Sequence, residues 1–186
     1  MAVQSLTADV IELALMRRRH LRQVLKIERL VYPRPWGHSV FMNELQAPAD
    51  QRFYIVARFG GRVVGYGGLM ASLDASDGSR SAHVTNIAVD PSLRRMKLGT
   101  CLLIELFQKA HEWRSVSVTL EVRHTNVAAQ ELYHRFGFLQ EGVRKRYYEN
   151  TDDAYVMWAR NIDQPAFFDR LETLAAESPG ATWLPS

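Results

Sequence analysis

The chain has 186 residues, is 47% hydrophobic and carries a formal net charge of +3 at pH 7. This length is typical of one domain with a sizeable core, and no apolar run approaches the roughly eighteen residues of a transmembrane helix. The first residues lack the charged and apolar segments of a signal peptide, so we expect a cytoplasmic protein.

Hydrophobic periodicity and turn residues predict alternating strands and helices. Gly60-Gly61 is typical of a tight β-hairpin, and a polar loop is expected at 74–80. The expected elements are, in chain order, a strand at 10–16, helices at 18–30 and 39–46, strands at 52–59, 62–73 and 81–89, a helix at 98–113, a strand at 115–122, a helix at about 127–135 and two further strands. Because helices follow some strands and hairpins join others, these elements predict a mixed sheet covered by helices, in a three-layer α/β or α+β domain.

The C-terminal segment carries a further helical pattern. Within 164–177 five apolar residues recur at helical spacing, namely Phe167, Phe168, Leu171, Leu174 and Ala175. Pro179-Gly180 ends this pattern before Trp183 and Leu184. We expect the helix to dock on the domain or on another copy of the chain, with packing as its role. The chain is thus divided into a domain at 1–163 and a helical extension and tail at 164–186, while its oligomeric state stays open.

One run, LEVRHTNVAAQELYHRFGF at 120–138, places a carboxylate, an amide and a phenol around the end of a strand. Glu121 ends the strand, and Asn126 and Tyr133 share a face of the following helix if that helix begins near Asn126. Taken singly, each has a simpler interpretation, because a glutamate at a strand end is more often a solvated rim residue and a helical tyrosine is more often core. The ordered set is more specific than its members.

Together with four other segments, this run resembles the GNAT acetyltransferases, and within them the RimI-type enzymes that acetylate the N-terminal amine of a ribosomal protein. The resemblance covers about residues 11 to 160. It implies a mixed, mostly antiparallel central sheet flanked by helices, with acetyl-CoA as the cosubstrate. The four further segments are Pro35-Trp36 with Phe41 and Glu44-Leu45, NIAVDP at 86–91, RKRYY at 144–148 and AYVMW at 154–158.

The resemblance places the phosphates of acetyl-CoA at 94–99, where Arg94 and Gly99 match the family pattern Q/R-x-x-G-x-G/A but Lys97 replaces the first glycine. A left-handed backbone costs a lysine about 1–2 kcal/mol, whereas a hydrogen bond from its ammonium to phosphate contributes about 1.5–3 kcal/mol. The effect of Lys97 on binding therefore stays open, and a solvated basic helix entry is the alternative. As the resemblance implies, the residues that bind acetyl-CoA are Ile87, Ala88, Val89, Arg94, Arg95, Met96, Lys97, Leu98, Gly99, Thr100 and Asn126.

No metal site is expected from the histidines and the cysteine. The six histidines form no i,i+4 or HExxH pair, and Cys101 is the only cysteine. Cys101 lies among helical leucines, which indicates a buried thiol without a catalytic role and excludes an internal disulfide.

The resemblance gives Glu121 and Tyr133 the catalytic roles of proton acceptor and proton donor. An N-terminal α-amine, with a pKa of about 7.7–8.0, is about ten percent neutral at pH 7, whereas a lysine amine is neutral in fewer than about one in a thousand molecules. A carboxylate base therefore suffices for an α-amine. A tyrosine pKa of about 10 lies above the value of about 8.5 for a thiol, so a strong hydrogen bond to the departing sulfur is favoured over early proton transfer. The resemblance also implies that the backbone N–H of Val89 polarises the acetyl carbonyl.

The acceptor side is less defined. Aromatic residues are expected to wall a groove for a peptide N-terminus, and acidic residues to attract its charge; these are Trp36, Tyr147 and Tyr148, and Glu149, Asp152 and Asp153. Ordinary packing and a solvated turn are the alternative. The resemblance implies a ribosomal protein N-terminus as the partner, while related enzymes acetylate other N-termini, lysines or small amines.

Two non-enzymatic functions are alternatives to catalysis. The basic runs at 17–20 and 144–146 and a pI of about 9.2 are compatible with nucleic acid, but no stacking aromatics, zinc pattern or helix-turn-helix accompany them. We therefore expect no dedicated nucleic-acid site and no membrane partner. The other function is that of a degenerate GNAT scaffold, which has lost acetyl-CoA binding through Lys97 and binds a protein or ribosomal partner.

Overall fold

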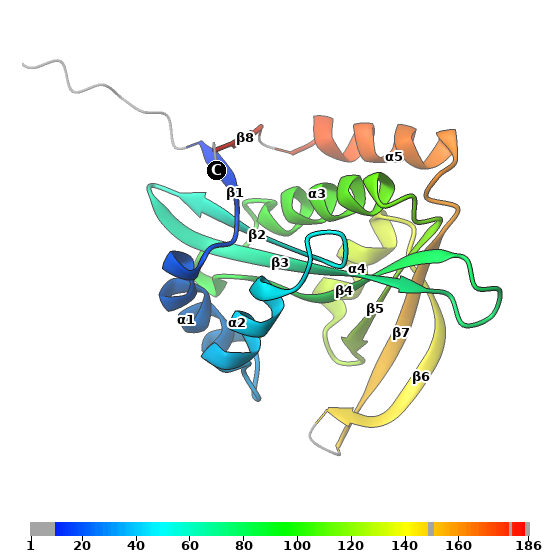
Figure 1. Cartoon of the computed structure of the whole chain (residues 1–186), viewed down its shortest axis with the longest axis horizontal. Coiled ribbons are helices and arrows are strands. Elements are labelled where there is room, and N and C mark those ends of the chain that lie inside the picture. Colours follow the sequence, from blue (N-terminus) through cyan, green and yellow to red (C-terminus); the bar gives the residue numbers. More distant parts are fainter. Residues whose placement is uncertain (1–9, 149–150, 179, 185–186) are drawn as a thin grey trace, which may run out of the picture.

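The computed structural model describes residues 10–148, 151–178 and 180–184, in which eight strands form one sheet with helices on both faces (Figure 1). The sheet order is β6-β7-β5-β4-β3-β2-β1-β8, and neighbours are antiparallel except in the pairs β4–β5 and β1–β8. This confirms the predicted mixed, mostly antiparallel sheet in an α/β domain. The strands are β1 (Ile11–Leu15), β2 (Arg52–Phe59), β3 (Arg62–Leu73), β4 (Arg80–Val89), β5 (Ser117–Arg123), β6 (Leu139–Tyr148), β7 (Asp152–Arg160) and β8 (Ala181–Trp183). The helices are α1 (Leu21–Val31), α2 (His38–Gln46), α3 (Leu98–Glu112), α4 (Val127–Arg135) and α5 (Pro165–Ala176), with 3-10 turns at Arg18–His20 and Pro91–Leu93.

The predicted elements are found in the predicted order, with two differences. Residues 18–20 form a 3-10 turn before α1, because His20 Nδ1 accepts from the backbone N–H of Arg17 while the backbone N–H of His20 donates to the Arg17 carbonyl. The second difference is β8, which extends the sheet beside β1 with Trp183 opposite Leu13. A three-residue strand is too short for its period-2 pattern to be recognised in the sequence.

Two local predictions are confirmed. Gly60 and Gly61 join β2 to β3 with φ of +54° and +75°, the two left-handed residues that a type I′ hairpin turn requires. Cys101 is buried in α3, and burial raises the pKa of its thiol. The turn thus sets the register of the central hairpin, and the thiol is a core group.

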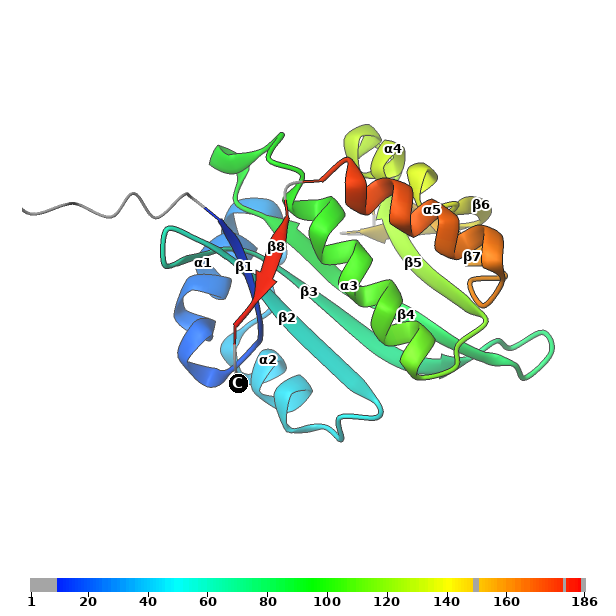
Figure 2. The same ribbon diagram turned by 90° about the horizontal axis from the view of Figure 1, so that it is seen from above.

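Two apolar cores lie on the two faces of the sheet. α1 and α2 cover one face, and α3, α4 and α5 cover the other, where Figure 2 shows α5 running beside α3. α5 docks on the domain, since Phe167 is 5% exposed and its ring centroid lies 4.9 Å from that of Phe107 in α3. Among the described helices, none is long and apolar enough to cross a membrane.

The sheet opens between β4 and β5. These parallel strands pair only at Ser81–Ser117, Ala82–Val118 and His83–Thr119 within the described residues, and beyond His83 strand β4 continues beside β3. The backbone groups on the open side of β4 are therefore available to a ligand. Side chains from both faces of the sheet can meet in this opening.

Candidate active site

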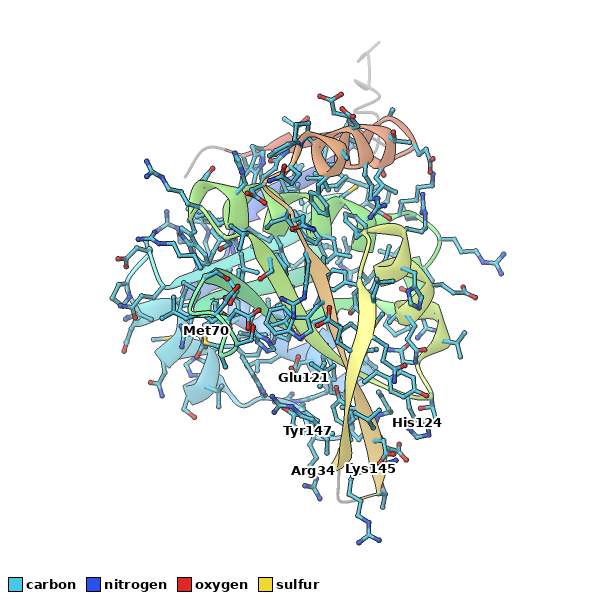
Figure 3. All side chains as sticks on the ribbon, turned by 90° about the vertical axis from the view of Figure 1, so that its right-hand side faces the viewer. Arg34, Met70, Glu121, His124, Lys145 and Tyr147 are labelled. Atoms are coloured by element: carbon cyan, nitrogen blue, oxygen red, sulfur yellow. The ribbon has the colours of Figure 1, made fainter. Side chains whose placement is uncertain are left out.

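A cavity of about 500 Å³ lies where β4 and β5 separate. Glu28 and Trp36 reach it from the α1–α2 side, and Tyr133 reaches it from α4 on the opposite face. Glu121 and Tyr147, both labelled in Figure 3, also line the cavity. The structure thus brings together the two residues predicted to be catalytic, Glu121 and Tyr133.

Glu121 on β5 has its carboxylate held between two partners. Its Oε2 lies 3.2 Å from His83 Nε2 on β4, and its Oε1 lies 3.1 Å from Arg144 Nη2 on β6. Only 11% of the Glu121 side chain is exposed. Burial lowers the pKa of His83, against the opposite effect of Glu121, so the imidazole is neutral near pH 7. A carboxylate beside a neutral imidazole can accept a proton and pass it on.

Tyr133 on α4 is 7% exposed and packs edge-on against Phe138, with ring centroids 5.7 Å apart. Burial, and to a smaller extent the neighbouring Tyr148, raises the pKa of its hydroxyl. The hydroxyl therefore stays protonated at neutral pH and can donate a hydrogen bond. Gln130 on the same helix donates to the carbonyls of Arg123 and His124, at 3.2 and 2.9 Å, which ties α4 to the end of β5.

The open edge of β4 presents backbone groups to the cavity. The backbone N–H of Asp90 donates to the Val64 carbonyl at 2.8 Å, and because bonding alternates along antiparallel strands, Ile87 and Val89 direct their backbone groups away from β3. The Ile87 carbonyl accordingly accepts from Tyr32 Oη at 2.8 Å.

Asn86 on β4 carries a donor that the described residues leave unused. Its Nδ2 is buried and has no hydrogen-bond partner among them, while its Oδ1 accepts from Thr85 Oγ1 at 3.3 Å. Asn86 lines the cavity. A buried donor without a partner is costly, so a ligand with an acceptor group at this point fits the site.

The turn before α3 has the left-handed backbone conformation that glycine favours, although two cationic residues adopt it. Arg95 and Lys97 have φ of +70° and +55°. Each left-handed residue costs about 1–2 kcal/mol when it carries a Cβ. α3 begins without a side-chain cap and without an acidic residue in its first turn, so its free N–H groups and the charges of Arg94 and Arg95 favour an anion. Gly99 packs closely against α4, since a Cβ there would lie 3.0 Å from Leu132 Cδ2.

Lys97 reaches the C-terminal helix. Its ammonium donates to the backbone carbonyl of Glu177 at the end of α5. Lys97 adopts the left-handed conformation, and its ammonium group is hydrogen-bonded to the end of α5.

Several residues expected to bind the cofactor have buried side chains. Ala88, Leu98 and Thr100 are 4%, 1% and 3% exposed, and Met96 packs against the larger core. The side chains of Ala88, Leu98 and Thr100 face protein, so these residues can serve a ligand only through backbone groups, whereas Met96 is partly buried.

Asn126 is the N-cap of α4. Its Oδ1 accepts from the backbone N–H of Ala129 at 3.2 Å, and α4 begins at Val127 as predicted. The cap uses the amide oxygen, which leaves the amide nitrogen to serve a ligand. Asn126 thus has a structural role that the sequence did not assign to it.

Glu28 anchors the loop that follows α1. Its Oε1 accepts from the backbone N–H of Trp36 at 2.8 Å, and its Oε2 accepts from Tyr66 Oη. The residue is 2% exposed, and burial raises the pKa of its carboxyl to about 7, against the opposite effect of the Trp36 N–H. Trp36 packs edge-on against Phe41, with ring centroids 5.4 Å apart, and lines the cavity as predicted.

Tyr147 and Tyr148 at the end of β6 also line the cavity, with ring centroids 5.1 Å apart. The guanidinium of Arg144 lies 5.4 Å from the Tyr147 ring centroid, and that of Arg123 lies 4.5 Å from the Tyr148 ring centroid. Cations over aromatic faces stabilise this arrangement. The three predicted aromatic residues therefore do surround one cavity.

The acidic residues expected to attract a peptide are paired with cations instead. Asp152 forms an ion pair with Arg123, and Asp153 lies 2.8 Å from Lys145 Nζ. The Lys145 side chain, on the part of β6 labelled in Figure 3, is 79% exposed, and neither aspartate is among the described residues that line the cavity. Both aspartates are half-buried ion-pair partners at the start of β7, while Glu149 lies outside the described residues. In the part of the chain that the structure describes, no group of three or more His, Cys, Asp or Glu residues could hold a metal ion.

His83 and Glu28 also line the cavity, although neither was predicted from the sequence. For Glu28 a signal exists, because it continues the apolar stripe of Leu21 and Val24 on α1, where a carboxylate is unexpected. His83 faces Glu121 only through the parallel register of β4 and β5, which no local pattern specifies.

The known proteins that this chain resembles are named as acetyltransferases. The family model described as Acetyltransferase (GNAT) family matches residues 21–138. The putative [ribosomal protein bS18]-alanine N-acetyltransferase of Bacillus subtilis (strain 168) is 34% identical over 144 residues, which cover 77% of this chain and 91% of that protein. The N-alpha-acetyltransferase RimI of Mycobacterium tuberculosis is 37% identical over 134 residues, covering 72% and 80%. The crystal structure of the ribosomal-protein-S18-alanine N-acetyltransferase from Escherichia coli superposes with a TM-score of 0.68 at 24% identity, covering 82% of this chain and 94% of that chain.

Proposed function

The chain belongs to the GNAT family of acetyltransferases, and from this premise we propose which residues carry its reaction and which amine it modifies. It is an acetyl-CoA-dependent N-alpha-acetyltransferase of the RimI type. We assign Glu121 as the base, Tyr133 as the donor to the departing sulfur and a ribosomal protein N-terminus as the acceptor. The observation that carries the assignment is the cavity between β4 and β5, which both side chains line from different elements.

The chain offers donors that suit each part of acetyl-CoA. The free N–H groups at the start of α3, with Arg94 and Arg95, suit the pyrophosphate. The open edge of β4 and the buried Nδ2 of Asn86 suit the carbonyl groups of the pantetheine arm, and the amide nitrogen of Asn126 lies at the start of α4. Acetyl-CoA supplies an acetyl thioester, whose C–S bond breaks as the new C–N bond forms.

Glu121 accepts the proton that the amine must lose. The carboxylate is largely buried in the cavity, where an amine can reach it directly or through one water. His83, kept neutral by burial, lies against Glu121 and offers the proton a route onward. Arg144 holds the other carboxylate oxygen and so fixes the orientation of the base.

Tyr133 and Val89 act on the charges that develop during transfer. The hydroxyl of Tyr133, whose pKa is raised by burial, keeps its proton and donates a hydrogen bond to the sulfur as negative charge grows there. We assign the backbone N–H of Val89 to polarise the acetyl carbonyl, and its direction away from β3, which follows from the strand alternation, supports this role. Both donors are fixed by the fold and need no reorganisation during the reaction.

An α-amine is the acceptor that this site serves best. At pH 7 about ten percent of an N-terminal amine is neutral, whereas a lysine amine is neutral in fewer than about one in a thousand molecules. The aromatic walls formed by Trp36, Tyr147 and Tyr148 suit the first residues of a peptide. Relatives named above act on the alanine N-terminus of ribosomal protein bS18, and we extend this acceptor to the chain, together with a cytoplasmic location. A lysine or a small amine is the alternative acceptor.

Acceptor identity is tested by offering acetyl-CoA with peptides that begin with alanine, with other residues, or with a blocked N-terminus and an internal lysine. Mass spectrometry then locates the added acetyl group. We expect acetylation at the N-terminal nitrogen of the alanine peptide. Acetylation confined to lysine would overturn the acceptor assignment, and absence of acetyl-CoA binding by calorimetry would overturn the enzyme function.

Two substitutions test the assigned residues. We expect Glu121→Gln to lower kcat about 100-fold or more, because the general base is lost while its size is kept. Tyr133→Phe should lower kcat with little change in acetyl-CoA affinity, since its hydrogen bond forms only as charge develops on sulfur. Glu131→Gln, an exposed charge removal on α4, is the matched control. Full activity in both variants would contradict the mechanism.

A further inference from the structure

α5 is joined to the turn that precedes α3. Lys97 in that turn donates from Nζ to the Glu177 carbonyl at the C-terminal end of α5. Figure 2 shows this end of α5 beside the beginning of α3. The last carbonyls of a helix have no intrahelical partner and form the negative end of its dipole, so an ammonium group is stabilising there.

Other contacts fix the end of α5 at this point. Arg135, the last residue of α4, forms an ion pair with the Glu177 carboxylate. Arg170 of α5 covers the turn after α4, where a Cβ added at Gly137 would clash with it. Leu174 is buried in the larger core. The partner of Lys97 is therefore held by the fold and does not move freely with the chain end.

The backbone conformation of Lys97 is one that a fixed hydrogen-bond partner stabilises. Its φ of +55° and ψ of +20° are left-handed, a conformation that glycine adopts at no steric cost but that disfavours a lysine. A change to another backbone conformation would carry the Lys97 side chain away from the Glu177 carbonyl. The hydrogen bond therefore selects the left-handed form of the turn.

We propose that α5 supports acetyl-CoA binding through Lys97, whose contact with the Glu177 carbonyl holds the turn in the conformation that presents its N–H groups to the pyrophosphate. Lys97 is then a positioning residue, and its ammonium is not a ligand of the phosphates. The inference rests on the proposed acetyl-CoA site at this turn. The rival explanation is direct binding of the Lys97 ammonium to phosphate, and the two differ in the effect of glycine at this position.

Calorimetric titration of the full chain with acetyl-CoA distinguishes the positioning role of Lys97 from direct binding of its ammonium to phosphate. Lys97→Met keeps the aliphatic stem but loses the anchor, so we expect the affinity to fall about fivefold. Lys97→Gly loses the same charge but adopts the left-handed turn without an anchor, so its affinity should stay within about twofold of that of the unmodified chain. Lys26→Met removes an equal charge from the exposed surface of α1 and is the control.

Hydrogen exchange gives a second readout, because coupling between two sites is reciprocal. Acetyl-CoA should slow amide exchange in the last turn of α5 in the unmodified chain, but not in Lys97→Gly, which binds without contacting Glu177. If Lys97→Met and Lys97→Gly weaken acetyl-CoA binding equally, Lys97 contacts the phosphates and the inference is overturned. Unchanged affinity in both variants would also overturn it. If the unmodified chain fails to bind acetyl-CoA, the proposed cosubstrate site itself is wrong.

Discussion

Replacing Glu28 with glutamine should change how the stability of the chain depends on pH. Glu28 is 2% exposed, and burial raises the pKa of its carboxyl from an ordinary 4.5 to about 7. Between these two values the folded chain holds a proton that the unfolded chain releases. The contribution of Glu28 to stability is therefore fully present below pH 4.5 and is lost as the pH rises through 7.

The size of this loss follows from the shift in pKa. One pKa unit corresponds to about 1.36 kcal/mol, so the part of the shift that falls between pH 5.5 and pH 8 amounts to about 2 kcal/mol. Glutamine cannot ionise, and its side-chain oxygen can still accept from the backbone N–H of Trp36, which Glu28 binds at 2.8 Å. The variant should keep the loop anchored and lose the pH-dependent penalty.

Urea denaturation of both proteins across this pH range measures the effect. The free energy of unfolding of Glu28→Gln minus that of the unmodified chain should rise by about 2 kcal/mol from pH 5.5 to pH 8. Other titrating groups, including His83, cancel in this difference. Glu172→Gln, an exposed charge removal on α5, controls for net charge. A difference that stays constant with pH, or that falls, would refute the assignment of a raised pKa to Glu28.

Three further predictions concern His83, which neighbours the base, and the C-terminal helix. His83→Gln should lower kcat about tenfold or more without weakening acetyl-CoA binding, because glutamine cannot take up a proton from Glu121. An unchanged kcat would mean that His83 serves packing alone. His111→Gln on α3 is the control. Since the pKa of His83 is lowered in the folded chain, this substitution should also become relatively stabilising as the pH falls below 6.5, as thermal unfolding can show. Phe167→Ala should lower the free energy of unfolding by about 3–5 kcal/mol, because Phe167 is 5% exposed against Phe107. A loss below about 1 kcal/mol would mean that α5 is not part of the cooperative core.

The elements were predictable where their signals are local. The Gly60-Gly61 turn, the amphipathic α3 and α4 beginning after Asn126 each depend on residues close in sequence, and each is found where the pattern places it. The turn at 18–20 and strand β8 were missed because a side-chain cap and a three-residue pairing with β1 determine them.

The candidate site was predictable for residues that lie in one contiguous motif. Glu121 and Tyr133 belong to a single strand-to-helix run, and both line the cavity. The role of Asp152 stayed open in the sequence because its partner, Arg123, lies on another strand, and charge complementarity between strands is visible only once they pair. His83 shows the same limit, because its approach to Glu121 follows from the register of β4 against β5.

The sequence by itself determined all the elements except the turn at 18–20 and the short strands and turns that distant contacts define, together with the family and the two residues proposed for catalysis, since periodicity and contiguous motifs are properties of neighbouring residues. Only the tertiary structure decided the environment of those residues: the neutral imidazole at Glu121, the buried carboxyl of Glu28 and the anchor of Lys97 on α5. Burial and contact between distant segments set these, and both arise only when the two faces of the sheet are covered and its strands are in register.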